Sequence, residues 1–176
     1  MIYLLLVDGF EEMEALTPVD VLRRCGADLL TVGVEKKTAV GAHGISVQCD
    51  ILFDEIKKED MEMLILPGGP GHTSLKTGKV QELIMYAAQR GIYIASICAA
   101  PSVVGELGLL EGRKATCFPG FEQELKGAQV LGDKVVKDGI YITAKGAGAA
   151  GEFAFCLAEL VCGKETAEKI KNAMQY

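Results

Sequence analysis

Short runs of consecutive apolar residues alternate with segments of helical periodicity, and this alternation constrains the fold more than any other feature of the chain. A run without polar residues is typical of a strand that is buried on both faces of a sheet. Strands of this kind, separated by helices, predict a mainly parallel sheet with helices on both sides. The sequence therefore predicts a single α/β domain over residues 1–176. The apolar runs lie at 1–7, 28–34, 63–66 and 92–97, and the helical segments lie near 11–25, 80–90, 101–107, 153–163 and 166–174.

Glycine and proline mark three of the segments between these elements. Residues 38–48 are expected to form a hairpin or an irregular pair of strands. The Asp138-Gly139 pair predicts a second hairpin, between two short strands in 134–143. The run at 67–71 contains only proline and glycine, so we expect no regular structure there. Glycines in such a loop allow N–H groups to approach a ligand closely.

Cys98 lies where an apolar strand turns directly into a helix. Pro101 suits the first turn of that helix, where its missing N–H costs no hydrogen bond. Ser96 and Ala100, on either side, are small, as a nucleophile elbow requires around its strained tip. A helix N-terminus favours an anion, so we expect the Cys98 thiol to ionise below its ordinary pKa of about 8.5. The alternative interpretation is a buried structural cysteine at a strand end.

Glu14, the Gly68-Gly69 loop and Cys98 each follow a predicted strand. Right-handed crossovers place the loops that follow parallel strands along one edge of the sheet. Ligands bind at that edge in open α/β sheets. We therefore expect the three features to meet in one crevice, which favours a site over a structural cysteine. Acidic residues also suit a first helical turn, so a purely structural role for Glu14 stays open.

The composition argues against several classes of partner. The net charge is −6 and no cluster of Lys and Arg occurs, so neither nucleic acid nor an anionic membrane is an expected partner. No apolar run approaches the ~20 residues that span a bilayer. Residues 1–7 lack a basic start and are assigned to a strand, not to a signal peptide. The 6 cysteines include no Cys-x-x-Cys pair. A hydrophobic chain of this length needs no disulfides to stabilise it, which favours a reducing cytoplasm.

Metal and nucleotide sites are also not expected. His43 and His72 are the only histidines, and neither has the spacing of a metal ligand. Both are expected to be surface or loop residues. The glycine run that begins at Gly68 lacks the Lys-Ser/Thr pair of a phosphate-binding P-loop.

The chain carries five short motifs in order: Gly-Phe-Glu-Glu-Met-Glu at 9–14, Pro-Val-Asp-Val-Leu-Arg-Arg at 18–24, Leu-Pro-Gly-Gly at 66–69, Ala-Ser-Ile-Cys-Ala-Ala-Pro at 95–101 and Glu-Phe-Ala at 152–154. Together they resemble the ThiJ/PfpI superfamily, in the branch of the human parkinsonism-associated protein and its bacterial homologues. The resemblance covers nearly the whole chain. It implies a flavodoxin-like three-layer sandwich that is usually a homodimer and needs no cofactor.

The resemblance also implies roles for single residues. By motif match, Cys98 takes the place of the family's reactive cysteine and Glu14 that of the acid beside it. The N–H groups of Gly69 and Ala99 match its oxyanion donors. The basic residues implied near the site, at the dimer interface, are Arg24 and His43.

Two positions depart from the family pattern. The protease-like branch has a histidine directly after the cysteine, whereas this chain has Ala99. Human-type members have a histidine before a proline near the site, and here Phe118 precedes Pro119. A Cys-His-acid peptidase mechanism is therefore poorly supported.

The leading functional hypothesis is a cysteine-dependent enzyme for small α-oxoaldehydes, of the glyoxalase or deglycase type that the resemblance implies. Cys98 would attack the aldehyde carbon, and Glu14 would move protons, since a neighbouring thiolate raises the pKa of a carboxyl. The alternative is a redox-sensing stress protein or chaperone whose Cys98 thiol is oxidised. An intracellular protease or amidase is the third and least supported possibility.

Overall fold

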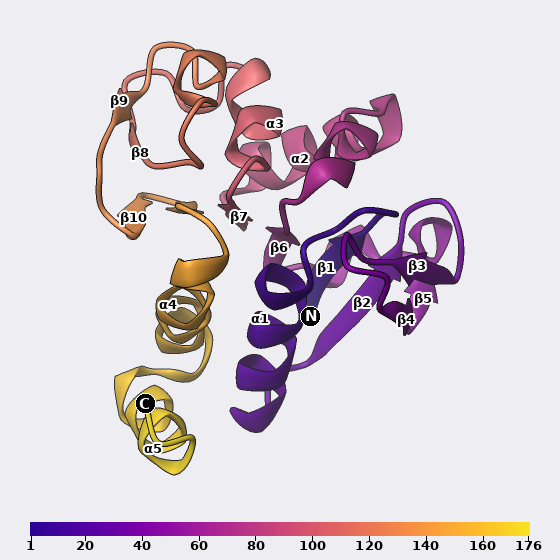
Figure 1. The fold of residues 1–176 in the computed structure, drawn as a ribbon, viewed down its shortest axis with the longest axis vertical. Coiled ribbons are helices and arrows are strands. Elements are labelled where there is room, and N and C mark those ends of the chain that lie inside the picture. Colours follow the sequence, from indigo (N-terminus) through magenta and orange to yellow (C-terminus); the bar gives the residue numbers. More distant parts are fainter.

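A seven-stranded sheet forms the centre of the protein, whose computed structural model describes residues 1–176 (Figure 1). The strand order is β10-β11-β7-β6-β1-β2-β5, and every neighbouring pair is parallel except β10 and β11. The predicted α/β fold with a mainly parallel sheet is confirmed. Its strands are β1 (Ile2–Leu6), β2 (Leu29–Gly33), β5 (Ile51–Leu52), β6 (Met63–Leu66), β7 (Tyr93–Ile97), β10 (Val135–Asp138) and β11 (Tyr141–Ala144).

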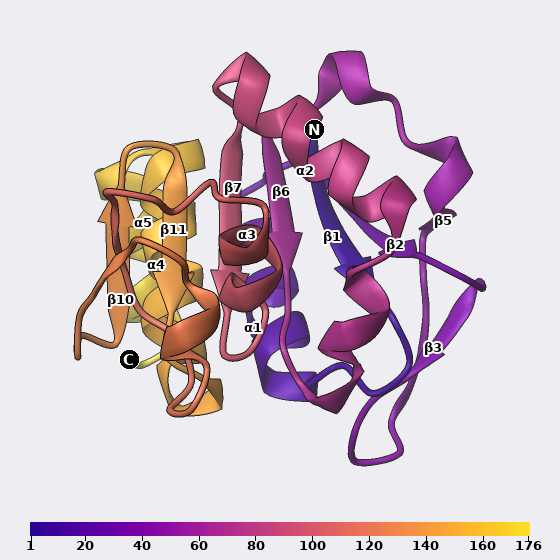
Figure 2. The same cartoon turned by 90° about the horizontal axis from the view of Figure 1, so that it is seen from above.

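Helices cover both faces of this sheet and complete a three-layer arrangement (Figure 2). Strand β1 shows why the apolar runs are continuous: Ile2 and Leu4 belong to one core, and Tyr3 and Leu5 belong to the other. Successive side chains of a strand point to opposite faces, so a strand between two layers is apolar at every position. The helices are α1 (Glu12–Arg24), α4 (Ala150–Cys162) and α5 (Lys164–Ala173) on one face, and α2 (Gly78–Arg90) and α3 (Pro101–Glu106) on the other. None of them combines the length and the apolarity needed to cross a bilayer.

Two small strand pairs lie outside the main sheet. Strands β3 (Thr38–Val40) and β4 (Ser46–Gln48) form the antiparallel hairpin that the sequence predicts. Strands β8 (Lys114–Ala115) and β9 (Gln129–Val130) form a short parallel pair. The Pro-Gly run is less irregular than predicted, because a 3-10 helix begins within it, at Pro70.

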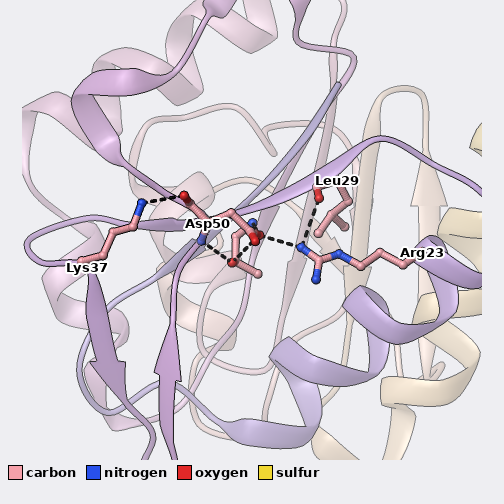
Figure 3. A network of polar contacts seen from close by, with 5 residues as sticks. Arg23, Leu29, Lys37 and Asp50 are labelled. Carbon is pink, nitrogen blue, oxygen red and sulfur yellow. Dashed lines mark hydrogen bonds and ion pairs between the residues drawn. The ribbon is translucent and has the colours of Figure 1, made fainter.

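A polar network fixes the last turn of α1 to the sheet (Figure 3). The Arg23 guanidinium pairs with the Asp50 carboxylate at 2.6 Å and also donates to the Leu29 carbonyl oxygen at 3.3 Å. The same Asp50 oxygen accepts hydrogen bonds from the N–H and the hydroxyl of Thr31, both at 2.7 Å. Lys37 donates to the Asp50 carbonyl oxygen. These bonds connect α1 to β2 and to the end of the β3–β4 hairpin, so the helix has a fixed position.

The carboxyl ends of β11, β7, β6 and β1 lie side by side along one edge of the sheet. The chain leaves β1 through α1 toward β2, and it leaves β6 through α2 toward β7, in the opposite direction. Neighbouring strands with divergent connections form a topological switch point, where open α/β sheets bind ligands. Loops that are far apart in sequence therefore meet beside β1 and β6.

Candidate active site

Cys98 occupies a strained turn between β7 and α3, as predicted for a nucleophile elbow. Its φ of 66° lies in the left-handed region that residues other than glycine rarely adopt. The Cys98 N–H donates to the Ala144 carbonyl oxygen at 2.9 Å, and the Cys98 carbonyl oxygen accepts from the Phe118 N–H at 2.8 Å. These two bonds hold the strained backbone. The residue is half-buried, so solvent reaches it, unlike a fully buried structural cysteine.

Glu14 projects from the start of α1 and is only 1% exposed. Its Oε2 accepts a hydrogen bond from the Gly68 N–H at 2.9 Å, while Oε1 is buried without a hydrogen-bond partner. Burial raises the pKa of Glu14 from 4.5 to about 7, against the opposing effect of its contact with the Cys98 thiol. The expected rise in the pKa of Glu14 is confirmed. Its cause is the burial of the carboxyl, and not a neighbouring thiolate as predicted. A carboxyl with this pKa can both accept and donate a proton at neutral pH.

The pKa of Cys98 moves in the direction opposite to the sequence prediction. Burial has the largest effect on the Cys98 thiol, and the charge and contact of the Glu14 carboxylate add to it. Together they raise the pKa of the thiol to about 12. The N–H groups of Gly69 and Ala99 lower it, but they are outweighed. Helix α3 has only 6 residues, so its dipole is small. Two adjacent anions are disfavoured, so Cys98 and Glu14 titrate as a pair: the pair loses its first proton near pH 7 and holds one proton above that pH.

Only glycine fits at the two positions of the Gly68-Gly69 loop. Gly68 packs against the Cys98–Glu14 pair, and Gly69 packs against the turn before α1. A Cβ at Gly68 would lie 2.6 Å from the Cβ of Cys98 and 2.7 Å from Oε2 of Glu14. A Cβ at Gly69, whose φ is 96°, would lie 2.5 Å from the Gly9 carbonyl oxygen. The backbone can therefore bring the Gly69 N–H to the sulfur, in the place that the predicted oxyanion donor requires.

His72 lies behind the glycine loop and is buried there. The prediction of a surface or loop residue is therefore wrong about its exposure. The residue belongs to the 3-10 helix after the loop but is only 9% exposed. Its Nδ1 lies 3.0 Å from the Gly69 carbonyl oxygen, and its ring packs edge-on against Phe121 with centroids 5.2 Å apart. A ring protonated at Nδ1 donates to that oxygen. His72 therefore fixes the orientation of Gly69.

A cavity of about 440 Å³ lies at the Gly146 turn, and neither Cys98 nor Glu14 is among the residues that line it. Phe118 forms one wall, and its N–H bond to the Cys98 carbonyl oxygen ties that wall to the elbow. Gly146 lies between the cavity and the acid: a Cβ there would be 3.3 Å from the Phe118 ring and 3.9 Å from Glu14 Oε1. The volume suits a small molecule. The lining consists of Phe118, Pro119, Lys134, Lys145 and residues 146–149.

The sequence pattern predicts no role for Lys134, Lys145 or the small residues at 146–149, which follow β11 and line this cavity. The available signal is positional: residues 146–149 follow a strand that is parallel to β7, so they reach the same edge as Cys98.

Arg24 and His43 do not reach Cys98 within one chain. Arg24 lies ten residues after Glu14 on the same helix, about 15 Å along its axis. Its Nε pairs with the Asp20 carboxylate at 2.9 Å, the local alternative that the i,i+4 spacing allows. His43 is exposed, and its Nδ1 pairs with Glu12 at 2.7 Å, which raises the pKa of the imidazole. Any part that these two residues play at the site requires a second subunit.

Glu11, Glu12 and His43 form the one group of potential metal ligands, with ligand atoms within 4.8 Å of one another. Both carboxyl oxygens of Glu12 already accept hydrogen bonds from His43, one from its N–H and one from its ring. Glu11 accepts from the Glu14 N–H at 2.8 Å and caps α1. Hydrogen bonding and helix capping account for this cluster.

Comparison with known proteins gives a consistent result. The model described as "DJ-1/PfpI family" matches residues 1–160. Protein DJ-1 homolog B of Arabidopsis thaliana is 38% identical over an alignment of 171 residues that covers 94% of this chain. The chain spans only 39% of the length of that plant protein. A deglycase of Pyrococcus horikoshii is 30% identical, and the match covers 80% of this chain and 87% of the archaeal protein.

Solved structures of other proteins have the same fold as this chain. The crystal structure of DJ-1beta from Drosophila melanogaster superposes with a TM-score of 0.93 and 31% sequence identity. The superposition covers 99% of this chain and 96% of the fly protein. The flavodoxin-like sandwich that the sequence resemblance implies is thereby confirmed.

Proposed function

Because the chain belongs to the DJ-1/PfpI family, we propose that it is a cysteine-dependent enzyme that acts on small α-oxoaldehydes or their adducts, without a cofactor. The activity would be of the glyoxalase III or deglycase type, and the archaeal relative that is named a deglycase supports this choice. One observation carries the proposal. A strained, solvent-accessible thiol contacts a buried carboxyl whose pKa is about 7.

The first step forms a bond between sulfur and carbon. The Glu14 carboxylate accepts the thiol proton as the Cys98 sulfur attacks the aldehyde carbon, and the carbonyl electron pair moves to oxygen. The N–H groups of Gly69 and Ala99, which already face the sulfur, stabilise this oxyanion. Each such donor contributes roughly 3 kcal/mol to the transition state. Glu14 then returns the proton to the oxyanion, which gives a hemithioacetal and restores the carboxylate.

The second step moves a proton between the two substrate carbons. The Glu14 carboxylate takes the proton from the former aldehyde carbon, and the electron pair forms the double bond of an enediolate. Glu14 delivers this proton to the neighbouring carbon while the hydroxyl proton of the first carbon passes to the enediolate oxygen on the second, so the first carbon becomes the carbonyl of a thioester on Cys98. Water then attacks the thioester carbon, the carbon–sulfur bond breaks, and a hydroxy acid leaves while the thiol is restored. A carboxyl with a pKa of about 7 suits this repeated transfer.

The cavity lined by Phe118 and Gly146 is the proposed place from which a small aldehyde approaches the pair, because the Phe118 N–H donates to the Cys98 carbonyl oxygen and Gly146 lies next to Glu14. A peptidase mechanism has less support. His43 pairs with Glu12 and His72 with Gly69, so neither histidine is placed to serve as the base for Cys98.

We also propose that the protein is a cytoplasmic homodimer. The proposal rests on the family resemblance and on the basic residues Arg24 and His43, which do not reach Cys98 in their own chain. Multi-angle light scattering measures the mass in solution. A monomer at micromolar concentration contradicts the dimer.

A redox-sensing role is the second candidate, and the same pair supports it. A protonated Glu14 can donate a hydrogen bond to an oxygen added to Cys98, which would hold the sulfur at the sulfinic stage. Graded peroxide followed by intact-mass measurement tests this role. Selective addition of two oxygens at Cys98 supports it, and equal addition of oxygen to Cys117 or Cys162 contradicts it.

The enzymatic proposal is tested by methylglyoxal turnover in purified protein, followed as the hydroxy acid formed. Cys98→Ala and Glu14→Gln are each expected to remove the activity. Cys156→Ala, at a half-buried cysteine on α4 outside the site, is the matched control and is expected to keep it. Turnover that survives in either site variant refutes the mechanism.

A further inference from the structure

A pair of cysteines lies at the edge of the sheet opposite the candidate active site. Cys25 follows the last residue of α1 as its C-cap, and Cys162 is the last residue of α4. The two helices follow the parallel strands β1 and β11 and pack on the same face of the sheet, so they run in the same direction (Figure 1). Each has 13 residues. Helices of equal length that begin at one edge also end together at the other.

The beginnings of these helices are in contact, which fixes their relative register. Glu14 at the start of α1 lies against Gly146, four residues before α4 begins. At the far end, the thiols of Cys25 and Cys162 lie close enough for each to affect the pKa of the other. Burial raises the pKa of both thiols, and the contact with Cys25 partly lowers the pKa of Cys162.

Three further features make this pair suited to form a bond. Both residues are half-buried, so a small oxidant can reach them. The Arg23–Asp50 network holds the last turn of α1 against the sheet, directly before Cys25 (Figure 3). Cys162 lies at a helix end followed by Gly163, whose φ of 81° redirects the chain into α5. One partner is therefore held in place, while the other lies at a turn that can adjust.

We propose that Cys25 and Cys162 are a redox modification site, which hydrogen peroxide converts to an intramolecular disulfide that joins the ends of α1 and α4. The Cys162 sulfur attacks one peroxide oxygen, the O–O bond breaks, and the other oxygen leaves as water after taking up protons. The Cys25 sulfur then attacks the sulfur of the resulting sulfenic acid. The S–S bond forms, the S–O bond breaks, and a second water leaves. The two thiols lose two electrons, which the peroxide gains.

The site is independent of the proposed function, since it shares no residue with the Cys98–Glu14 pair. The disulfide would close a loop that holds most of the chain, and a long loop gives the largest loss of entropy in the unfolded state. We expect oxidation to raise the melting temperature by about 5 °C or more. The rise should disappear when either cysteine is replaced.

The test uses the full chain carrying Cys98→Ala, so that oxidation at the elbow does not obscure the result. The reduced protein is treated with hydrogen peroxide, free thiols are blocked by alkylation, and non-reduced peptides are analysed by mass spectrometry. Trypsin leaves Cys156 and Cys162 in one peptide, so a second cleavage after Glu159 is needed to separate them. The expected product is a peptide pair joined through Cys25 and Cys162, with the loss of two hydrogen atoms from the intact chain.

Matched variants complete the test. Cys25→Ser and Cys162→Ser should each abolish the joined peptide and the shift in melting temperature, whereas Cys156→Ser should keep both. The proposal is overturned if Cys25 and Cys162 are recovered as separately alkylated or singly oxidised residues. It is also overturned if the bond joins two chains on a non-reducing gel, or if Cys156→Ser removes it.

Discussion

The burial of Glu14 predicts that Glu14→Gln changes how the stability of the protein depends on pH. The pKa of this carboxyl is about 7 in the folded protein against 4.5 for the ordinary group. The folded state therefore binds the proton more tightly than the unfolded state does. This contribution to stability is fully present below pH 4.5 and is lost as the pH rises through 7. At about 1.4 kcal/mol per unit of pKa, the loss amounts to roughly 3 kcal/mol.

The assay is urea unfolding of both proteins at pH 5 and at pH 8.5, under reducing conditions and at one protein concentration. Glutamine keeps the shape of the protonated acid but does not titrate. The free energy of unfolding of Glu14→Gln, relative to the unmodified protein, should therefore rise by ~3 kcal/mol between the two pH values. Taking this difference between pH values cancels any pH-independent cost of the amide.

Glu12→Gln is the control with the opposite sign. Hydrogen bonds from His43 outweigh the effect of burial and lower the pKa of Glu12. The stability that Glu12 contributes is thus present above its unfolded pKa of 4.5 and is lost only as the pH falls below that value. The free energy of unfolding of Glu12→Gln, relative to the unmodified protein, should therefore be nearly the same at pH 5 and pH 8.5 and should change only in more acid solution. A relative stability of Glu14→Gln that stays constant within about 0.5 kcal/mol across this range would refute the assignment of a buried, proton-binding carboxyl to Glu14.

Three further predictions concern the same site. Gly69→Ala should destabilise the protein by about 2–4 kcal/mol in urea unfolding, because a Cβ there meets the Gly9 carbonyl oxygen at 2.5 Å. The displaced Gly69 N–H should also lower kcat at least ~100-fold. A variant with ordinary activity refutes the oxyanion role. The kcat/KM of methylglyoxal turnover should rise with pH through about 7, since the pair must first lose one proton; a flat profile from pH 5 to 9 contradicts this. His72→Ala should lower kcat with little change in KM. His72→Asn should have a higher kcat than His72→Ala, because an amide can still donate to the Gly69 carbonyl oxygen. An equal loss of kcat in both variants argues against a positioning role.

Much of the fold is predictable from the sequence because its strongest signals are local. The continuous apolar run of β1 and the Asp138-Gly139 turn each specify one element, and both are found where predicted. The two-residue strand β5 is not predicted, since Ile51–Leu52 is too short to show a period. It follows the β3–β4 hairpin directly and pairs with β2 at the edge of the sheet, a contact with a strand about 20 residues earlier that a two-residue segment cannot indicate.

The positions of the site residues were predictable, but their electrostatics were not. Topology brings Glu14 and Cys98 to one edge, and the motif spacing is sufficient for that inference. The pKa of Cys98 depends on burial and on the carboxylate beside it, and a sequence shows neither. The local rule that a helix N-terminus lowers a thiol pKa fails here because α3 is short and the desolvation of the sulfur is larger. The burial of His72 is also not visible in the sequence, because Phe121, which packs against it, lies 49 residues further along the chain.

The central claim is that Cys98 and Glu14 work as one proton-sharing pair, and the rate of Cys98 alkylation as a function of pH tests it most directly. The modified peptide is quantified in the unmodified protein and in Glu14→Gln. We predict an inflection near pH 7 in the unmodified protein and its absence in Glu14→Gln, where the thiol should titrate as a single group. Identical profiles in the two proteins would show that the sulfur ionises independently of the acid, and the account would be wrong.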